Sequence, residues 1–328
     1  MIRDALGRSV ATVIAVEHLT KAFGRTVAVR DVCFDAGAGE AIGLLGPNGS
    51  GKTTIMRMLA GYFPPTSGRI WVDGIEVGRD ALRARGRVGY LPENAIWYPE
   101  MRVAQFLAFC ADVRRLRGAR RRTRLAAVLE ACGLTDVAQR LIGHLSKGYR
   151  QRVGIAQAIV HEPPVLVLDE PTVGLDPRQV VEIRQLIRAL RGRTTVLFST
   201  HVLSEVSSVC DRVVIIDRGR VVAEDSAAAL AREQQRGERT LLRVEGPAAQ
   251  VAAALRALPG VEQVEVEAGD GGAAQLVVTT LHSTPTPAAL AAAVVGRGWG
   301  LVELRPLAMS LEDLYVRLVA PPDDAPAA

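Results

Sequence analysis

An α/β fold with a largely parallel sheet is predicted for most of this 328-residue chain. The first observation is that short apolar runs of strand length alternate with helical segments up to about residue 217. The second is the glycine-rich turn GPNGSGKT at 46–53, which lies between an apolar run and a helix. The third is the apolar run PPVLVLDEP at 163–171, which ends on two carboxylates. Together these features are typical of an α/β layer with a ligand site at the strand ends.

The elements follow in order along the chain. Short strands are expected in residues 14–45 from VIAVEHL, VAVRDVCF and EAIGLLG, and a helix at 52–61 that stops at Gly61. Helical periodicity then runs from about 102 to 160 in VAQFLAFCADV, RLAAVLEAC and YRQRVGIAQAIV. Strands follow in PPVLVLDEP, TTVLFSTH and RVVIIDRGR, separated by helices at 178–191 and near 202–209.

Composition divides the chain into two domains and two end segments. We predict an N-terminal extension at 1–13, a main domain at 14–238 with a helical subdomain at about 94–162, and an accessory α+β domain at 239–320. The strands LLRVEG, VEQVEVEA and AAQLVVTT and a helix at 286–295 indicate the accessory domain, which carries no chemical motif. The tail 321–328 is expected to be disordered.

Charge, cysteine usage and hydropathy exclude some classes of protein. The net charge of +5 argues neither for nor against a nucleic-acid partner. The four cysteines form no C-x-x-C pair, which favours free thiols in a reducing cytosol over disulfides or metal ligands. The apolar stretch at 9–16 lacks a cleavage pattern, and no apolar run reaches membrane-spanning length. The sequence therefore predicts a soluble chain whose membrane role, if any, comes through a partner.

The turn at 46–53 matches the phosphate-loop pattern G-x-x-x-x-G-K-[ST]. Its glycines let successive backbone N–H groups face one anion, and the following helix adds its N-terminal dipole. Lys52 is expected to reach the β- and γ-phosphates of ATP, and Thr53 to hold Mg²⁺; the alternative is a purely structural turn. The candidate ATP-binding residues of this segment are Gly46, Pro47, Asn48, Gly49, Ser50, Gly51, Lys52, Thr53 and Thr54.

Three further residues follow apolar strands. Asp169 and Glu170 end a buried run, where an unpaired carboxylate is costly unless a metal or a water uses it. Asp169 is the candidate Mg²⁺ carboxylate and Glu170 the candidate base for the attacking water, although a helix cap at Asp169 is the alternative. His201 ends the next strand and is a candidate partner of the γ-phosphate or the water; a lone histidine is otherwise an ordinary satisfied polar residue.

With GPNGSGKTT, LSKGYRQR, VLVLDEP, VGLD and STH in this order, the chain resembles the ATP-binding cassette family, the nucleotide-binding subunits of ABC transporters. The resemblance covers about residues 14–238 and implies a cassette with a mixed sheet core and a helical subdomain, followed by the small α+β domain. It implies an ATP hydrolase that forms a head-to-tail homodimer, with each ATP held between the phosphate loop of one copy and the LSGGQ-type loop of the other. Glu170 and His201 are then the catalytic carboxylate and the switch histidine, and Phe23 stacks on adenine.

The same resemblance implies contacts across the dimer. ATP held by one copy would meet the other copy at Ser146, Lys147, Gly148, Tyr149 and Asp176. The helix that starts in HLSKGYRQR would meet the γ-phosphate there, with Ser146 and the backbone of Gly148 as donors.

Two positions depart from the family pattern. Glu93, in GYLPE, stands where the family usually has glutamine; it is a candidate Mg²⁺ ligand with Thr53 and Asp169, and it adds negative charge beside Asp169 and Glu170. LSKGY replaces LSGGQ, which brings Lys147 into a phosphate-facing segment. Whether Lys147 touches the phosphate or faces solvent is left open by the sequence.

The chain also resembles the exporter branch whose permease is a separate chain. This resemblance rests on LPEN, YPEM, LSKGYRQR and SLEDLYVRL at 310–318. This implies a peripheral subunit at the cytoplasmic face of the inner (plasma) membrane, with NAIWYPEMRV at 94–103 in the groove for the permease; Trp97 and Tyr98 are otherwise ordinary packing. The arginine run at 113–124 would face anionic lipid or form a solvated helix face.

Two other functions compete with transport. A soluble ABC ATPase acting on ribosomes or DNA usually carries two cassettes or a long coiled-coil insertion, and this chain has one phosphate loop and no heptads. A phosphate-loop kinase would leave LSKGY without a role. Export is therefore the predicted function, and no nucleic-acid partner is expected.

Overall fold

The computed structural model describes residues 2–3, 9–10, 12–226, 229, 237–267, 273–281 and 285–307. Contacts divide the chain into two compact units, residues 1–227 and 228–328, so the division falls before the expected boundary at 238. The tail 321–328 and the segment 310–318 lie outside the described residues. Within those residues, no helix has the length and apolar character needed to cross a membrane.

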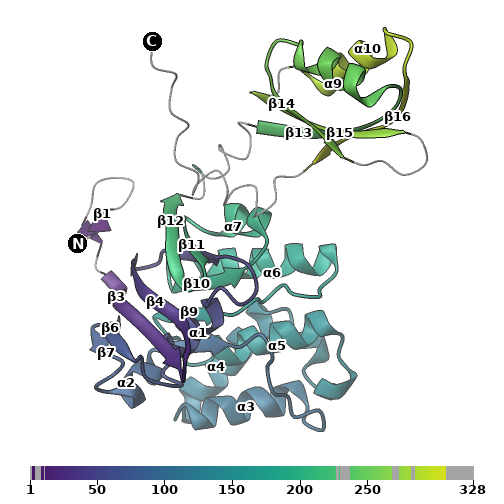
Figure 1. The fold of residues 1–328 in the computed structure, drawn as a ribbon. Helices are drawn as coiled ribbons and strands as arrows, with labels where there is room; N and C mark the ends of the chain where they lie inside the picture. The colour runs from purple at the N-terminus through teal and green to yellow at the C-terminus, as the bar shows by residue number, and fades with distance from the viewer. Residues whose placement is uncertain are drawn as a thin grey trace. The chain divides into compact units, whose positions relative to one another are not determined.

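The main sheet of unit 1 has six strands in the order β12-β11-β5-β10-β9-β8 (Figure 1). Its strands are β5 (Ala41–Leu45), β8 (Val88–Leu91), β9 (Val165–Leu168), β10 (Thr195–Thr200), β11 (Arg212–Asp217) and β12 (Arg220–Ser226). All neighbours pair in parallel except β11 and β12. The expected parallel sheet is confirmed, and its central strands β5, β9 and β10 are fully buried, as strands covered on both faces must be.

A second, antiparallel sheet has the order β4-β3-β6-β7. It consists of β3 (Thr12–Phe23), β4 (Thr26–Gly37), β6 (Ser67–Val72) and β7 (Ile75–Glu76). The strands expected within residues 14–45 are present, but β3 and β4 are longer than expected, with 12 residues each. A tight turn at Gly24, with φ 58°, joins them as a hairpin, and a hairpin pairs its strands antiparallel.

Seven α-helices lie among the described residues of unit 1. They are α1 (Lys52–Leu59), α2 (Ala81–Gly86), α3 (Val103–Val113), α4 (Gly118–Ala131), α5 (Lys147–Ile159), α6 (Pro177–Leu190) and α7 (Leu203–Val209). Helices α3, α4 and α5 lie together in the part of the unit where a helical subdomain was predicted (Figure 1). One hydrophobic core joins α1 to both sheets through Ile14, Ile42, Ile55 and Leu197.

Helix α5 approaches strand β8 very closely at Gly89. A Cβ added to Gly89 would lie 2.2 Å from the backbone oxygen of Ala158 and 3.0 Å from Pro163 Cγ. Because backbone cannot swing aside as a side chain can, this close contact fixes α5 against the sheet. Ser146 of the LSKGY segment is the N-cap of that same helix, and 147–149 lie in its first turn.

We expect Gly89→Ala to lower the free energy of unfolding by about 1–3 kcal/mol, because the added methyl group overpacks this contact. Gly78→Ala is the matched control, since Gly78 is exposed and its added Cβ would meet no atom within 4 Å. Urea unfolding of both variants measures the difference. Equal effects of the two changes would show that the α5 contact adapts to the methyl group.

Unit 2 is an antiparallel sheet in the order β14-β15-β13-β16, with two helices on one face (Figure 1). Its elements are β13 (Gly237–Glu245), α9 (Ala248–Arg256), β14 (Val261–Glu267), β15 (Ala274–Leu281), α10 (Pro287–Val295) and β16 (Gly300–Leu307). The three expected strands and the helix at 286–295 are present, whereas α9 and β16 were not predicted. Helix α9 is rich in alanine, so only Val251, Ala252 and Leu255 mark its buried face.

Candidate active site

The phosphate loop connects the buried strand β5 to helix α1. Gly49 and Gly51 have φ 80° and 110°, a backbone conformation that side chains rarely adopt. A Cβ on Gly46 would lie 2.1 Å from the oxygen of Ile216, so this position also requires glycine. Helix α1 begins at Lys52, which directs its N-terminal dipole and free N–H groups into the loop. The loop therefore has the glycine-dependent turn and the helix start that an anion site requires.

Lys52 is a buried cation inside this loop, with only 5% of its surface exposed. Its Nζ donates to the oxygens of Gly46, at 2.7 Å, and Pro47, at 3.0 Å. Glu170 Oε1 lies 3.5 Å from the same Nζ. This ammonium group thus sits between the phosphate loop and the end of β9, where a negative ligand charge is stabilised.

Asp169 is fully buried at the end of β9, and its two oxygens have different surroundings. Oδ1 accepts hydrogen bonds from Thr53 Oγ1 at 3.1 Å and Ser199 Oγ at 2.8 Å. Oδ2 is buried without a hydrogen-bond partner. A buried, unpartnered carboxylate oxygen beside a threonine hydroxyl fits the oxygen ligands that Mg²⁺ prefers. Ser199, two residues before His201, was not among the predicted site residues.

Glu170 is buried and has φ 48°, a strained backbone conformation for a residue with a side chain. Its N–H donates to Ser199 Oγ at 2.9 Å, and its Oε2 lies 3.0 Å from His201 Nδ1. Its Oε1 is buried without a hydrogen-bond partner. Ser199 therefore contacts the Asp169 carboxylate and the Glu170 backbone, while Lys52 and His201 lie at the two oxygens of the Glu170 carboxylate.

The pKa of the Asp169 carboxyl is raised, first by burial and also by the nearby negative charge of Glu93. Hydrogen bonds from Ser199 and Thr53 act in the opposite direction. Glu93 itself is exposed. The added negative charge expected at this position therefore acts on Asp169.

We expect Glu93→Gln to move the acid limb of ATP hydrolysis to lower pH. Mg²⁺ binding at the predicted site would need ionised Asp169, so a raised pKa of Asp169 would weaken binding as the pH falls, and removal of the Glu93 charge would reverse part of that shift. The pH profile of kcat/KM at limiting Mg²⁺ measures the change. A loss of Mg²⁺ affinity at neutral pH, with the acid limb unmoved, would instead identify Glu93 as a metal ligand.

Phe23 is a half-exposed aromatic residue at the end of β3, with 51% of its surface exposed. It packs edge-to-face on Phe63, with 5.6 Å between ring centroids, and Lys21 Nζ lies 5.2 Å and 5.0 Å from the two rings. An exposed ring held by neighbours is a suitable stacking platform. Phe63, which supports it, was not predicted from the sequence.

The candidates for contacts across a dimer form a second group. Ser146 caps α5 by accepting from Tyr149 N at 3.4 Å, and Asp176 caps α6 by accepting from Gln179 N at 2.9 Å. Gly148 lies against Gln179, where an added Cβ would meet Cδ at 2.7 Å. Lys147 Nζ would lie 2.3 Å from a Cβ on Gly174. The two helix starts therefore lie together, with Lys147 beside the VGLD segment of its own chain.

The two groups of site residues are separate within one chain. Across the described residues, no hydrogen bond or ion pair connects 146–149 to the phosphate loop at 46–54. One chain thus presents the phosphate loop and a separate, exposed helix start.

Comparison with known proteins identifies the same family as the residues do. The family model described as ABC transporter matches residues 29–173. The linearmycin resistance ATP-binding protein LnrL of Bacillus subtilis (strain 168) is 31% identical over 306 residues, which cover 93% of this chain and 97% of that protein. The daunorubicin resistance ATP-binding protein DrrA3 of Streptomyces coeruleorubidus is 38% identical over 223 residues, covering 68% and 71%.

Among solved structures, the dimeric, post-hydrolysis form of the ATP-binding cassette MJ0796 bound to ADP and Pi superposes with a TM-score of 0.60. It is 26% identical and covers 65% of this chain and 98% of that chain. The expected cassette fold, the family and the ATP hydrolase activity are confirmed. The chain belongs to the ABC transporter family, as an ATP-hydrolysing ATP-binding subunit of the exporter type.

Proposed function

We propose that Glu170 is the base of ATP hydrolysis and that Lys52 and His201 position the γ-phosphate and the attacking water. The observation that carries this proposal is that two buried oxygens on adjacent residues, Asp169 Oδ2 and Glu170 Oε1, accept no hydrogen bond. Glu170 Oε2 is held by His201, which leaves Oε1 as the oxygen that accepts a proton from water. Lys52 next to Oε1 stabilises the charge that moves onto the phosphate oxygens.

Thr53 and Asp169 would hold Mg²⁺, which when bound supplies charge neutralisation at the β- and γ-phosphates. The Thr53 hydroxyl donates to Asp169 Oδ1, so the two side chains that would bind the ion lie next to each other. Ser199 keeps the carboxylate oriented by donating to that same oxygen.

We propose that the helix start at 146–149 completes the site of a second copy. Ser146 and Lys147 are exposed, and Tyr149 is 40% exposed, so this surface is accessible to a partner. The N-terminus of α5 carries a partial positive charge that favours a phosphate. Asp176 on the neighbouring helix start would contact the dimer interface.

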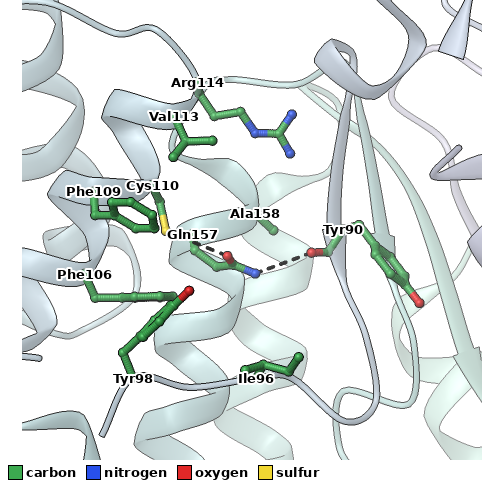
Figure 2. Close-up of a pocket in the computed structure, with 10 residues that line it drawn as sticks. All are labelled: Tyr90, Ile96, Tyr98, Phe106, Phe109, Cys110, Val113, Arg114, Gln157 and Ala158. Carbon is green, nitrogen blue, oxygen red and sulfur yellow. Dashed lines mark hydrogen bonds between the residues drawn. The ribbon is translucent and has the colours of Figure 1, made fainter. Parts of the chain in front are cut away.

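We further propose that a separately encoded permease docks on an apolar pocket between α3, α5 and the segment after β8 (Figure 2). The pocket has a volume of about 330 Å³. Tyr98 packs on Phe106 and Phe109, with ring centroids 6.2 Å and 6.1 Å apart. Gln157, on α5, donates a hydrogen bond to the backbone oxygen of Tyr90. Ile96 is 87% exposed at its edge. Exposed apolar side chains around a hollow are typical of a protein contact site.

A larger neighbouring cleft of about 1550 Å³ gives this surface its charge. Its described lining contains no Asp or Glu but includes Arg57, Arg83, Arg85, Arg114, Arg115 and Arg120. The permease segment is therefore expected to combine apolar and acidic side chains. Trp97 fits both roles considered for it. It packs on Phe106, with 6.2 Å between ring centroids, and it also lines this cleft.

The arginine run at 113–124 is largely committed to contacts within the fold. Arg117 and Arg121 pair with Asp112, while Arg120 and Arg124 pair with Glu162. These pairs favour a solvated helix face over a lipid-binding patch. Attachment at the cytoplasmic face of the membrane would then depend on the permease. Relatives named for drug resistance support export as the direction of transport.

We expect Ile96→Asp to abolish recovery of the chain with membranes that contain its permease, because a carboxylate would enter the apolar edge of the docking pocket. Val181→Asp is the control, since Val181 is 49% exposed on α6 and lies outside both hollows. Sedimentation of membranes followed by immunoblotting measures retention. Recovery of ribosomes in place of a membrane protein would overturn the transport assignment.

A further inference from the structure

Strands β3 and β4 contain two neighbouring bulges, one on each strand. Val16 pairs with Phe34 and Leu19 with Val32, so two residues of β3 stand opposite Cys33 alone. Leu19 pairs with Val32 and Lys21 with Val29, so two residues of β4 stand opposite Thr20 alone. His18 belongs to the first bulge and Asp31 to the second.

Both bulge residues have left-handed backbones although neither is glycine. His18 has φ 49° and Asp31 has φ 52°. The neighbouring strand accommodates the first bulge with Gly68, where an added Cβ would lie 2.2 Å from the oxygen of His18. Non-glycine residues held in this conformation carry strain and cluster at functional sites, so the side chains of His18 and Asp31 are candidates for a function.

The two bulges bring three metal-ligating side chains together. His18 Nδ1 lies 2.8 Å from Asp31 Oδ1, and the backbone N–H of His18 donates to Cys33 Sγ at 3.1 Å. The potential ligand atoms of the three side chains all lie within 4.8 Å of one another. All three residues are exposed, with 79% and 62% of the His18 and Asp31 side chains open to solvent, so an ion has direct access.

We propose that His18, Asp31 and Cys33 bind a divalent transition-metal ion of the zinc class, with water in the fourth position. Zn²⁺ takes imidazole nitrogen at about 2.0–2.1 Å and thiolate sulfur at about 2.3 Å, so small rotations of these exposed side chains complete a tetrahedral site. Metal binding at Nδ1 requires the His18 tautomer that carries its proton on Nε2, so a proton on Nδ1 passes to Nε2 through solvent; the Cys33 thiol releases its proton to solvent.

The ligand set separates this site from the Mg²⁺ site at Asp169. A sulfur and an imidazole nitrogen select zinc-class ions over Mg²⁺ and Ca²⁺, which prefer oxygen ligands alone. The spacing of the cysteines gave no sign of this site, because one ligand comes from β3 and two come from β4, and only the paired bulges align them. The bound ion would link the two strands and stabilise the hairpin that carries Phe23.

The test is a titration of tag-free, nucleotide-free protein with Co²⁺, which has an absorption band for thiolate coordination, followed by displacement with Zn²⁺. We expect one equivalent of Co²⁺ to produce that band. Cys33→Ser should eliminate the band, and Asp31→Asn should weaken Zn²⁺ binding by at least about tenfold. Glu17→Gln is the matched control, because Glu17 is a neighbouring carboxylate on β3 paired with Arg69, and it should bind as the unchanged chain does.

A second readout uses only the unchanged chain and does not depend on whether the variants fold. Zn²⁺ should slow alkylation of Cys33 by iodoacetamide, because the thiolate that reacts would be bound to the metal, whereas Mg²⁺ at the same concentration should not. Peptide mass mapping locates the modified cysteine. Absence of the thiolate band, an equal band in Cys33→Ser, or unprotected Cys33 in the presence of Zn²⁺ would each overturn the proposal.

Discussion

Replacement of Glu170 by glutamine is expected to lower kcat for ATP hydrolysis by about 10²–10⁴-fold, the usual contribution of a general base. Glutamine keeps the shape of the side chain but cannot accept a proton from the attacking water. The amide still fits beside Lys52 and His201, which lie 3.5 Å and 3.0 Å from the carboxylate oxygens. ATP binding should therefore survive, and ATP should accumulate in the closed dimer.

Two measurements on the Glu170→Gln variant separate catalysis from folding. Phosphate release gives kcat, and size-exclusion chromatography with ATP and Mg²⁺ reports a dimer that persists because hydrolysis no longer opens it. Glu162→Gln is the control: Glu162 is paired with arginines on the surface, and its loss should leave kcat unchanged. Normal hydrolysis by Glu170→Gln would exclude Glu170 as the base, whereas a loss of ATP binding would assign it to nucleotide binding.

Much of this site was predictable because its residues are local in sequence. The phosphate loop fixes glycines, a lysine and a helix start within eight residues, and the structure builds them as one turn. Asp169 and Glu170 follow a run that is apolar throughout, which identifies a buried strand and its end. For these residues, the functional side chains and the residues that determine the local backbone conformation belong to the same short segment of sequence.

Other features depend on partners distant in sequence and were missed. Ser199 orients Asp169 and Glu170 across two strands, yet a serine before a histidine carries no signal of its own. The antiparallel sheet likewise depends on distant partners, because β3 pairs with β6, which follows the phosphate loop and α1 along the chain. The sequence left open whether Lys147 touches the phosphate or faces solvent, because its neighbour, Gly174, lies on a different loop.

Mixing two inactive variants should restore ATP hydrolysis if each site is shared between two copies. Lys52→Ala removes the cation of the phosphate loop, where Lys52 Nζ bonds Gly46 and Pro47. Ser146→Arg places a long cation at the start of α5, where Ser146 caps the helix. Each variant alone has two defective sites per dimer and is expected to be inactive.

A mixed dimer has one site that combines the intact phosphate loop of the Ser146→Arg copy with the intact helix start of the Lys52→Ala copy. With equal amounts and random pairing, up to about a quarter of all sites are intact, so about a quarter of wild-type activity is the upper bound. If the helix start instead served the phosphate loop of its own chain, both sites of every mixed dimer would carry a defect and mixing would restore nothing. Phosphate release from the mixture, compared with each variant at the same total concentration, distinguishes the two cases. The lack of a hydrogen bond between 146–149 and 46–54 in the described residues of one chain favours recovery.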